Sequence, residues 1–167
     1  MGGQHAWKVV DRTVAAIDPA EAIAAVSDVG FGGIDVFIGK VRDLNQGRAV
    51  QGITYDLFEP LVMQEIGRLV AEVEAQFGPR VTLYVAHAKG RLAVGEVAVV
   101  VAAGTPHRDA AFRACRQLIE SVKHRLPIWK QEHYEDGDSA WSEGCSLCQD
   151  TAEADDHAHA HGQPTHC

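Results

Sequence analysis

The stretch EVAVVVAAGTPHRDAAFRACRQLIESVKHRLPIWKQE, residues 96–132, encodes a strand, a helix and the start of another strand in succession. Residues 96–104 are apolar on both faces, so we expect this strand to lie in the interior of a sheet. Pro127 ends the helix predicted over about 107–126, because proline cannot continue the helical hydrogen bonds. An apolar stripe at helical spacing marks the buried face of this helix: Ala111, Cys115, Leu118 and Val122.

Further strands are predicted on both sides of this stretch by runs of β-branched and aromatic residues. They cover residues 8–14, 32–42, 50–58, 80–88 and the hairpin 128–143. The second and third of these strands are expected to pair with each other across the loop 43–49. The fourth is joined to the strand at 96–104 by a short connection that contains Gly90 and Gly95.

Two more helices are predicted from their start signals. One begins at Pro19 with Asp18 as its N-cap residue, and the other begins at Pro60. Several strands are joined too tightly for parallel crossovers, so we expect an α+β fold with a mixed or mainly antiparallel sheet packed by helices. Residues 1–144 are expected to form a single domain. Residues 145–167 have few bulky apolar side chains and are expected to form a disordered, acidic tail.

Composition and charge argue against several classes of protein. The chain has 167 residues, of which 46% are hydrophobic, and its formal net charge is −8. This acidic surplus disfavours a general nucleic-acid binder, because phosphate groups are bound by cations. No apolar run is long enough to cross a membrane, and the start MGGQHAWKVVDR lacks the basic and apolar regions of a secretory signal. We therefore expect a cytosolic protein with neither nucleic acid nor membrane as a partner.

Against this acidic background, the stretch 107–130 is basic, with six Lys or Arg residues and two acidic ones. His107 and Arg108 stand at the start of the long helix, where free backbone N–H groups favour an anion. Lys123 stands near its end, where a favourable interaction with the helix dipole is the simpler explanation. One small anionic ligand would account for the cluster, and a solvated helix face is the alternative.

Two more pairs of charged residues stand on predicted strands. Lys40 and Arg42 occur where a strand runs into a glycine-containing loop. Lys130 and Glu132 share one side of the strand after the long helix, with Gln131 on the other side. Each pair could equally be a surface pair or the protection of an edge strand.

The chain contains no glycine-rich phosphate loop, no GxGxxG and no GxSxG motif. Cys115 falls on the apolar stripe of a helix and is interpreted as a core residue. His87, near a strand end, is interpreted as structural. The candidate chemistry therefore rests on the charged residues.

Three strings in this order resemble one family. FIGKVRDLNQG (37–47), YDLFEPLVMQEI (55–66) and TPHRDAAFRACRQLIESVKHRLPIWKQE (105–132) closely resemble the large, catalytic subunit of molybdopterin synthase. The resemblance covers about residues 30–143 and implies an α/β hammerhead-like fold. It also implies a partner, a small ubiquitin-like sulfur carrier whose C-terminal Gly-Gly ends in a thiocarboxylate. The two convert cyclic pyranopterin monophosphate into the dithiolene molybdopterin, in molybdenum cofactor biosynthesis, and no cofactor is implied.

Substrate-binding roles follow from the resemblance residue by residue. Lys40, Val41 and Arg42 match the family's substrate-binding loop. His107 and Arg108 match its anion-binding pair. Both groups are therefore implied to hold the substrate.

Catalytic roles follow in the same way. Lys123 matches the lysine that meets the carrier's terminus, and Lys130, with Gln131 and Glu132, matches the second catalytic segment. The resemblance thus implies that Lys123 and Lys130 are catalytic and that Gln131 and Glu132 contact substrate. Cations suit this reaction, because the phosphate and the thiocarboxylate are both anions that must meet.

The positions of these residues on one helix predict a homodimer. Lys123 follows Arg108 by 15 residues, which at the helical rise is about 22 Å. One chain cannot place both around a small pterin, whereas two chains around a two-fold axis can. We expect composite sites in which His107 and Arg108 of one chain face Lys123 and Lys130 of the other. The resemblance also implies a dimer, with one small subunit at each end.

The last segment supports a rival hypothesis, a protein that binds or delivers a metal. Its possible soft-metal ligands are Cys145, Cys148, His157, His159 and His161. A flexible tail with incidental metal affinity is the simpler interpretation. A third alternative is a non-catalytic anion-binding relative, which would have no need of both catalytic lysines.

Overall fold

β6 (Val97–Thr105) is an interior strand in the computed structural model, which describes residues 4–143. It lies between β2 (Gly33–Lys40) and β5 (Thr82–Ala93) and runs antiparallel to both. Eight of its nine residues are buried, as expected for a strand that is apolar on both faces.

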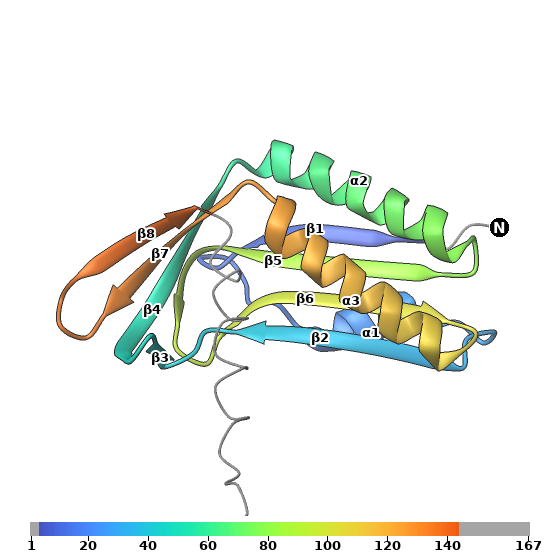
Figure 1. The fold of residues 1–167 in the computed structure, drawn as a ribbon, viewed down its shortest axis with the longest axis horizontal. Coiled ribbons are helices and arrows are strands. Elements are labelled where there is room, and N and C mark those ends of the chain that lie inside the picture. Colours follow the sequence, from blue (N-terminus) through green and yellow to red (C-terminus); the bar gives the residue numbers. More distant parts are fainter. Residues whose placement is uncertain (1–3, 144–167) are drawn as a thin grey trace, which may run out of the picture.

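The sheet continues beyond β5, as Figure 1 shows. The other strands are β1 (Ala6–Asp11), β3 (Leu44–Asn45), β4 (Arg48–Leu57), β7 (Ile128–Tyr134) and β8 (Ser139–Glu143). The order is β2-β6-β5-β4-β7-β8, with β1 paired to β5 and β3 paired to β4. The β1–β5 pair is parallel, and the other strand pairs within the described residues are antiparallel. The expected mixed, mainly antiparallel sheet is therefore confirmed.

One expected strand pair is wrong, because the strand at 50–58 does not pair with the strand at 32–42. β4 pairs instead with β5 and β7. The reason is that β5 does not end before Gly90 but continues through it and pairs four further residues with β4. Gly90 has φ +96°, which L side chains rarely adopt. Gly52 permits the close approach of β4, because a Cβ there would lie 2.5 Å from the carbonyl oxygen of Leu92.

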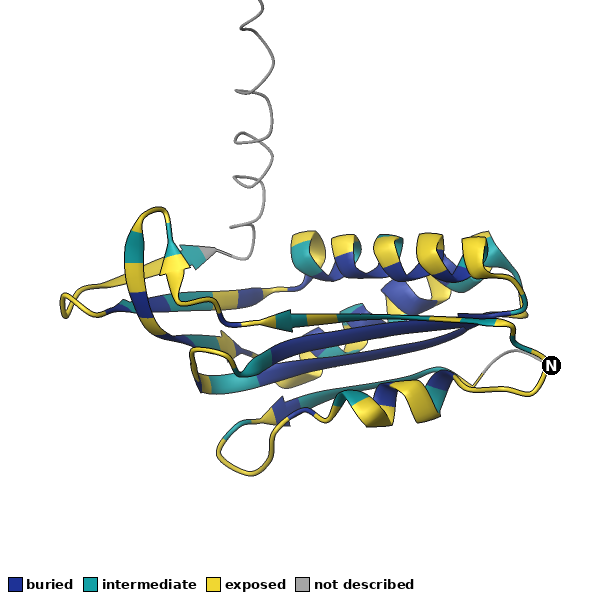
Figure 2. Cartoon of the chain, turned by 90° about the horizontal axis from the view of Figure 1, so that it is seen from below, coloured by how far each residue is buried: buried dark blue, intermediate teal, exposed yellow. Residues whose placement is uncertain are grey.

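Helices cover both faces of the sheet. α2 (Glu59–Phe77) and α3 (Arg108–Arg125) lie side by side on one face, and the short α1 (Pro19–Val26) lies on the other (Figures 1 and 2). The predicted stripe of α3 is buried: Ala111, Cys115, Leu118 and Val122. It packs with the apolar face of α2 in the larger core, and a smaller core lies beneath α1.

The helix starts follow the predicted signals. The Asp18 carboxylate accepts a hydrogen bond from the backbone N–H of Ala20 at 2.9 Å, and Pro19 is the first residue of α1. Pro60 lies in the first turn of α2, which is followed by Gly78 at φ +86°. Local chemistry therefore sets where these helices begin and end.

Several expectations concern residues 145–167 and lie outside the described residues. They are the disordered acidic tail, the boundary between this tail and the domain 1–144, and the possible metal ligands Cys145, Cys148, His157, His159 and His161. Within residues 4–143, no helix is long and apolar enough to span a membrane.

Candidate functional site

A cavity of about 510 Å³ opens where the end of β2, the last turn of α3 and the strands β4 and β7 come together. Five of the predicted site residues line it: Lys40, Arg42, Lys123, Lys130 and Glu132. They come from three separate parts of the chain, and four of them are cations. The fold therefore concentrates positive charge around one cavity in an acidic protein.

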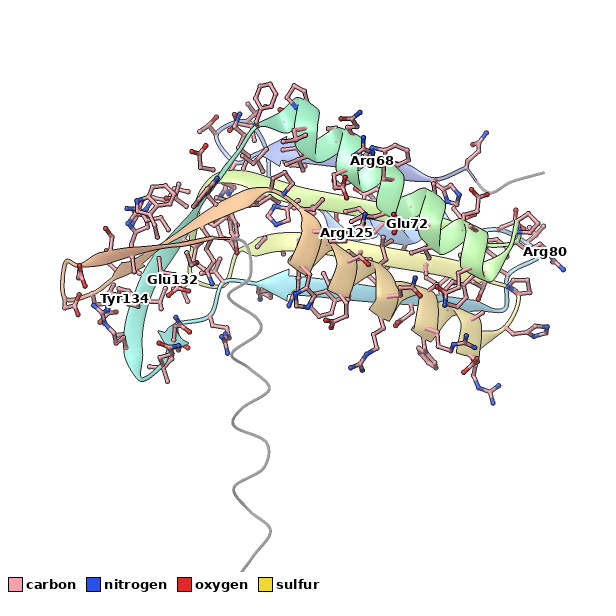
Figure 3. All side chains as sticks on the ribbon, turned by 45° about the horizontal axis from the view of Figure 1, so that its top comes forward. Arg68, Glu72, Arg80, Arg125, Glu132 and Tyr134 are labelled. Atoms are coloured by element: carbon pink, nitrogen blue, oxygen red, sulfur yellow. The ribbon has the colours of Figure 1, made fainter. Side chains whose placement is uncertain are left out.

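Lys123 is half-buried in the last turn of α3. Its Nζ lies 5.3 Å from the centroid of the Phe37 ring, over the ring face, which is a favourable position for a cation. Arg125, two residues further on, donates hydrogen bonds to Glu65 at 2.9 Å and to Glu72 at 2.5 Å on α2 (Figure 3). These bonds fix the end of the helix that carries Lys123.

Lys130 and Glu132 project from β7 into the same cavity, as strand alternation predicts. Lys130 Nζ lies 2.7 Å from Glu132 Oε1. The other carboxylate oxygen, Oε2, accepts hydrogen bonds from Asn45 Nδ2 and from the Tyr134 hydroxyl, each at 2.5 Å (Figure 3). Burial raises the pKa of Glu132, but the bonds from Lys130, Tyr134 and Asn45 outweigh it and keep this pKa below its ordinary value. Glu132 is thus a buried carboxylate that joins Lys130 on β7 to Asn45 on β3.

His87 and Tyr55 also line the cavity, and the sequence did not mark either as a site residue. Their rings meet edge to face, with centroids 5.1 Å apart. Burial lowers the pKa of His87 to about 4, and burial together with the charge of Glu132 raises the pKa of Tyr55 to about 12. Both side chains are therefore neutral near pH 7. The one available signal for His87 was an imidazole ring within the mostly apolar run of residues 81–88.

The remaining predicted residues lie away from this cavity. The side chain of Val41 is 3% exposed and packs in the smaller core, while its backbone bonds to Glu96 and Gly95 fix the loop between Lys40 and Arg42. Gln131 faces the other side of β7 and donates a hydrogen bond to Ser139 Oγ at 3.1 Å.

His107 and Arg108 are exposed at the opposite end of α3 from Lys123. The helical rise over 15 residues separates Arg108 and Lys123 by about 22 Å. His107 is the N-cap residue of α3, and its side chain makes no capping hydrogen bond. Within one chain, this pair is not brought to the cavity.

Cys115 is the only cysteine among the described residues, and its thiol lies in the core. It is 1% exposed, and burial raises its pKa to about 12, so it stays protonated near neutral pH. Among residues 4–143, no group of three or more His, Cys, Asp and Glu side chains could hold a metal ion. The groups of the cavity that can take part in chemistry are therefore three lysines, Arg42, the Glu132 carboxylate and two neutral rings.

The chain is similar to known proteins over most of its length. Residues 12–125 match the model of a family described as MoaE protein. A molybdopterin synthase catalytic subunit from Synechococcus elongatus is 42% identical over 146 residues, which cover 87% of this chain and 88% of the relative.

Solved structures agree with this similarity. The crystal structure of molybdopterin synthase from Staphylococcus aureus has a TM-score of 0.75 and 27% identity, and covers 81% of this chain and 95% of its own. A Helicobacter pylori structure with a TM-score of 0.63 and 24% identity is described as a complex of subunits 1 and 2 of molybdopterin-converting factor, and covers 81% of this chain and 89% of its own. The resemblance seen in the sequence is confirmed. The chain belongs to the MoaE family, among the molybdopterin synthase catalytic subunits.

Proposed function

We propose that this chain transfers sulfur from the C-terminal thiocarboxylate of a small carrier protein to cyclic pyranopterin monophosphate, forming the dithiolene of molybdopterin. The observation that carries the proposal is the gathering of Lys40, Arg42, Lys123 and Lys130 around one cavity. The thiocarboxylate and the substrate phosphate repel each other in water. Four cations in a partly enclosed space offset that repulsion and give each anion a partner.

The two half-buried lysines are assigned the catalytic roles. Lys123 meets the incoming thiocarboxylate, and Lys130 acts beside it under the control of Glu132. When sulfur replaces the ester oxygen on the pterin side chain, the C–O bond breaks and the oxygen leaves with the phosphate, whose added negative charge a lysine ammonium can neutralise. Water then cleaves the bond between the sulfur and the carrier's terminal acyl group, which is released as a carboxylate, and a lysine can transfer the proton of that water. Lys40 and Arg42, both exposed at the mouth of the cavity, hold the substrate phosphate.

The sulfur comes from a separate protein in this proposal. Cys115 supports this, because its protonated thiol in the core cannot act as a nucleophile or carry sulfur to the cavity. The Helicobacter pylori relative forms a complex between two different subunits, which also supports a small protein partner.

We further propose a homodimer with composite sites. His107 and Arg108 are exposed, lie about 22 Å from Lys123 along α3 and match an anion-binding pair. β2 supports a dimer, because it is an edge strand that exposes Ile34 and Ile38 by 41% and 43%. An Arg108→Ala chain mixed with a Lys123→Ala chain is expected to recover activity, since half of its mixed-dimer sites would be intact. Mixed dimers without activity would contradict composite sites.

The test of the proposed function is a reconstituted reaction. The purified chain, a thiocarboxylated small subunit and cyclic pyranopterin monophosphate are mixed, and the product is detected as its fluorescent oxidised pterin. Product is expected with the wild-type chain and not with Lys123→Ala. If a competent small subunit gives no product with the wild-type chain, the proposal is wrong. The cytosolic location stays a prediction, which cell fractionation would check.

A further inference from the structure

The polar groups of the cavity are arranged by depth. Lys40 and Arg42 are exposed at the mouth, and Lys123 and Lys130 are half-buried. His87 is 7% exposed and lies at the floor. Glu132 is equally buried, but its carboxylate is bonded to Lys130, Asn45 and Tyr134. The neutral ring of His87 is therefore a deep polar group to which the proposed reaction gives no role.

The hydrogen bond made by His87 identifies its tautomer. Nδ1 lies 2.8 Å from the carbonyl oxygen of Ala88. A carbonyl oxygen can only accept, so Nδ1 must carry the hydrogen. Because a ring buried this deeply stays neutral, Nε2 has no hydrogen and can accept a bond. The floor of the cavity thus offers one hydrogen-bond acceptor on a ring that its backbone bond and the Tyr55 ring hold in place.

We infer that His87 binds the pterin ring of the substrate, with Nε2 accepting a hydrogen bond from a ring N–H group. This inference rests on the proposed function and adds a specificity-determining residue to it. A pterin is a flat ring system rich in N–H donors, and Phe37 and Tyr55 supply aromatic surface beside the acceptor. Its phosphate would remain with the cations nearer the mouth.

The small subunit is the competing source of N–H donors, because its C-terminal glycines have backbone amides. A carrier tail enters with its negative thiocarboxylate first, and that group stops at the half-buried lysines. The amides of the tail then trail toward the mouth, away from His87. The depth of His87 therefore favours the pterin over the carrier.

Two substitutions separate binding by Nε2 from a structural role of Nδ1. In His87→Asn the amide nitrogen can replace Nδ1 and keep the bond to Ala88, but nothing replaces Nε2. In His87→Gln the longer side chain places an oxygen near the position of Nε2. His133→Asn is the matched control, because His133 is bonded to Thr54 at 2.8 Å and does not line the cavity.

The experiment measures steady-state kinetics in the reconstituted reaction, with the pterin and the small subunit varied separately. His87→Asn is expected to raise KM for the pterin roughly 10- to 100-fold, the cost of leaving a buried donor unpaired. KM for the small subunit is expected to stay unchanged, His87→Gln to recover part of the loss and His133→Asn to behave as wild type. An unchanged KM for the pterin in His87→Asn, a raised KM for the small subunit, or better recovery in Asn than in Gln overturns the inference.

A measurement on the wild-type chain decides the matter if the variants do not fold. In protein labelled with ¹⁵N-histidine, His87 Nε2 is expected to resonate as a nitrogen without hydrogen and to shift when cyclic pyranopterin monophosphate is added without the small subunit. A signal that does not move refutes the ring contact. The proposed function fails separately, by the absence of product from the wild-type reaction.

Discussion

Replacing Glu132 by glutamine tests whether this buried carboxylate holds the cavity together. The Glu132 side chain is 9% exposed and that of Lys130 is 21% exposed, so water shields their pair only in part. In Glu132→Gln, Lys130 loses its charged partner, at a cost of about 1–3 kcal/mol. Asn45 and Tyr134 then donate to a neutral amide oxygen instead of a carboxylate, which weakens each bond by about 0.5–1 kcal/mol.

The expected loss of unfolding free energy is therefore about 2–5 kcal/mol, and calorimetry should show a melting temperature lower by on the order of 10 °C. The Lys123-dependent activity should fall as well, because Lys130 is no longer held. Glu135→Gln is the matched control, since Glu135 is an exposed carboxylate next to the same strand. A Glu132→Gln variant that melts within about 2 °C of wild type would refute the assigned role of this carboxylate.

The unfolding free energy of the same variant is also expected to depend on pH differently from that of the wild type. The pKa of Glu132 is lower in the folded protein than its ordinary value of 4.5. As pH falls below 4.5, the unfolded chain therefore protonates this carboxyl before the folded chain does, and the folded state loses its advantage. The stability difference between wild type and Glu132→Gln should be constant above about pH 5.5 and narrow below pH 4.5. The other carboxylates do not affect this stability difference, because both proteins contain them. A stability difference that widens in acid would contradict this account.

Three further predictions follow from other parts of the structure. Cys115→Ala is expected to retain activity within about twofold in the reconstituted reaction, because the thiol is in the core; a loss as large as that of Lys123→Ala would contradict delivery of sulfur by a partner. Gly104→Ala is expected to destabilise the fold by more than about 3 kcal/mol in urea unfolding, because a Cβ there would lie 2.1 Å from the carbonyl oxygen of Val26; an unchanged midpoint would count against this packing. A chain truncated after Gly144 is expected to keep full synthase activity, whereas a metal-delivery protein would lose its function.

Features that depend on neighbouring residues were predictable from the sequence. The buried stripe of α3 and the burial of β6 follow from the spacing of apolar side chains. The shared face of Lys130 and Glu132 follows from strand alternation, and the structure places both at the cavity. Each of these arguments uses only the residues of a single helix or strand.

Features that depend on distant residues were not predictable in this way. The partners of β4 depend on β5 continuing through Gly90, and a glycine there is equally typical of a turn. His87 illustrates the same limit at the site. A single histidine in an apolar strand has the same local pattern whether its ring lies in the core or at the floor of a cavity, and only the positions of β4, β7 and α3 distinguish the two.

The two ends of α3 show why the cations of this helix need different explanations. A cation in the last turn, such as Lys123, is favoured by the helix dipole, so its position alone does not require a ligand. A cation in the first turn, such as Arg108, is disfavoured by the same dipole and lies beside the free N–H groups of the helix start. Among residues 4–143, no ion pair of Arg108 offsets this cost, whereas a bound anion would. Since that end of α3 lies about 22 Å from Lys123 of its own chain, this cost supports the proposed composite site, in which Arg108 would meet an anion held in the cavity of a second chain.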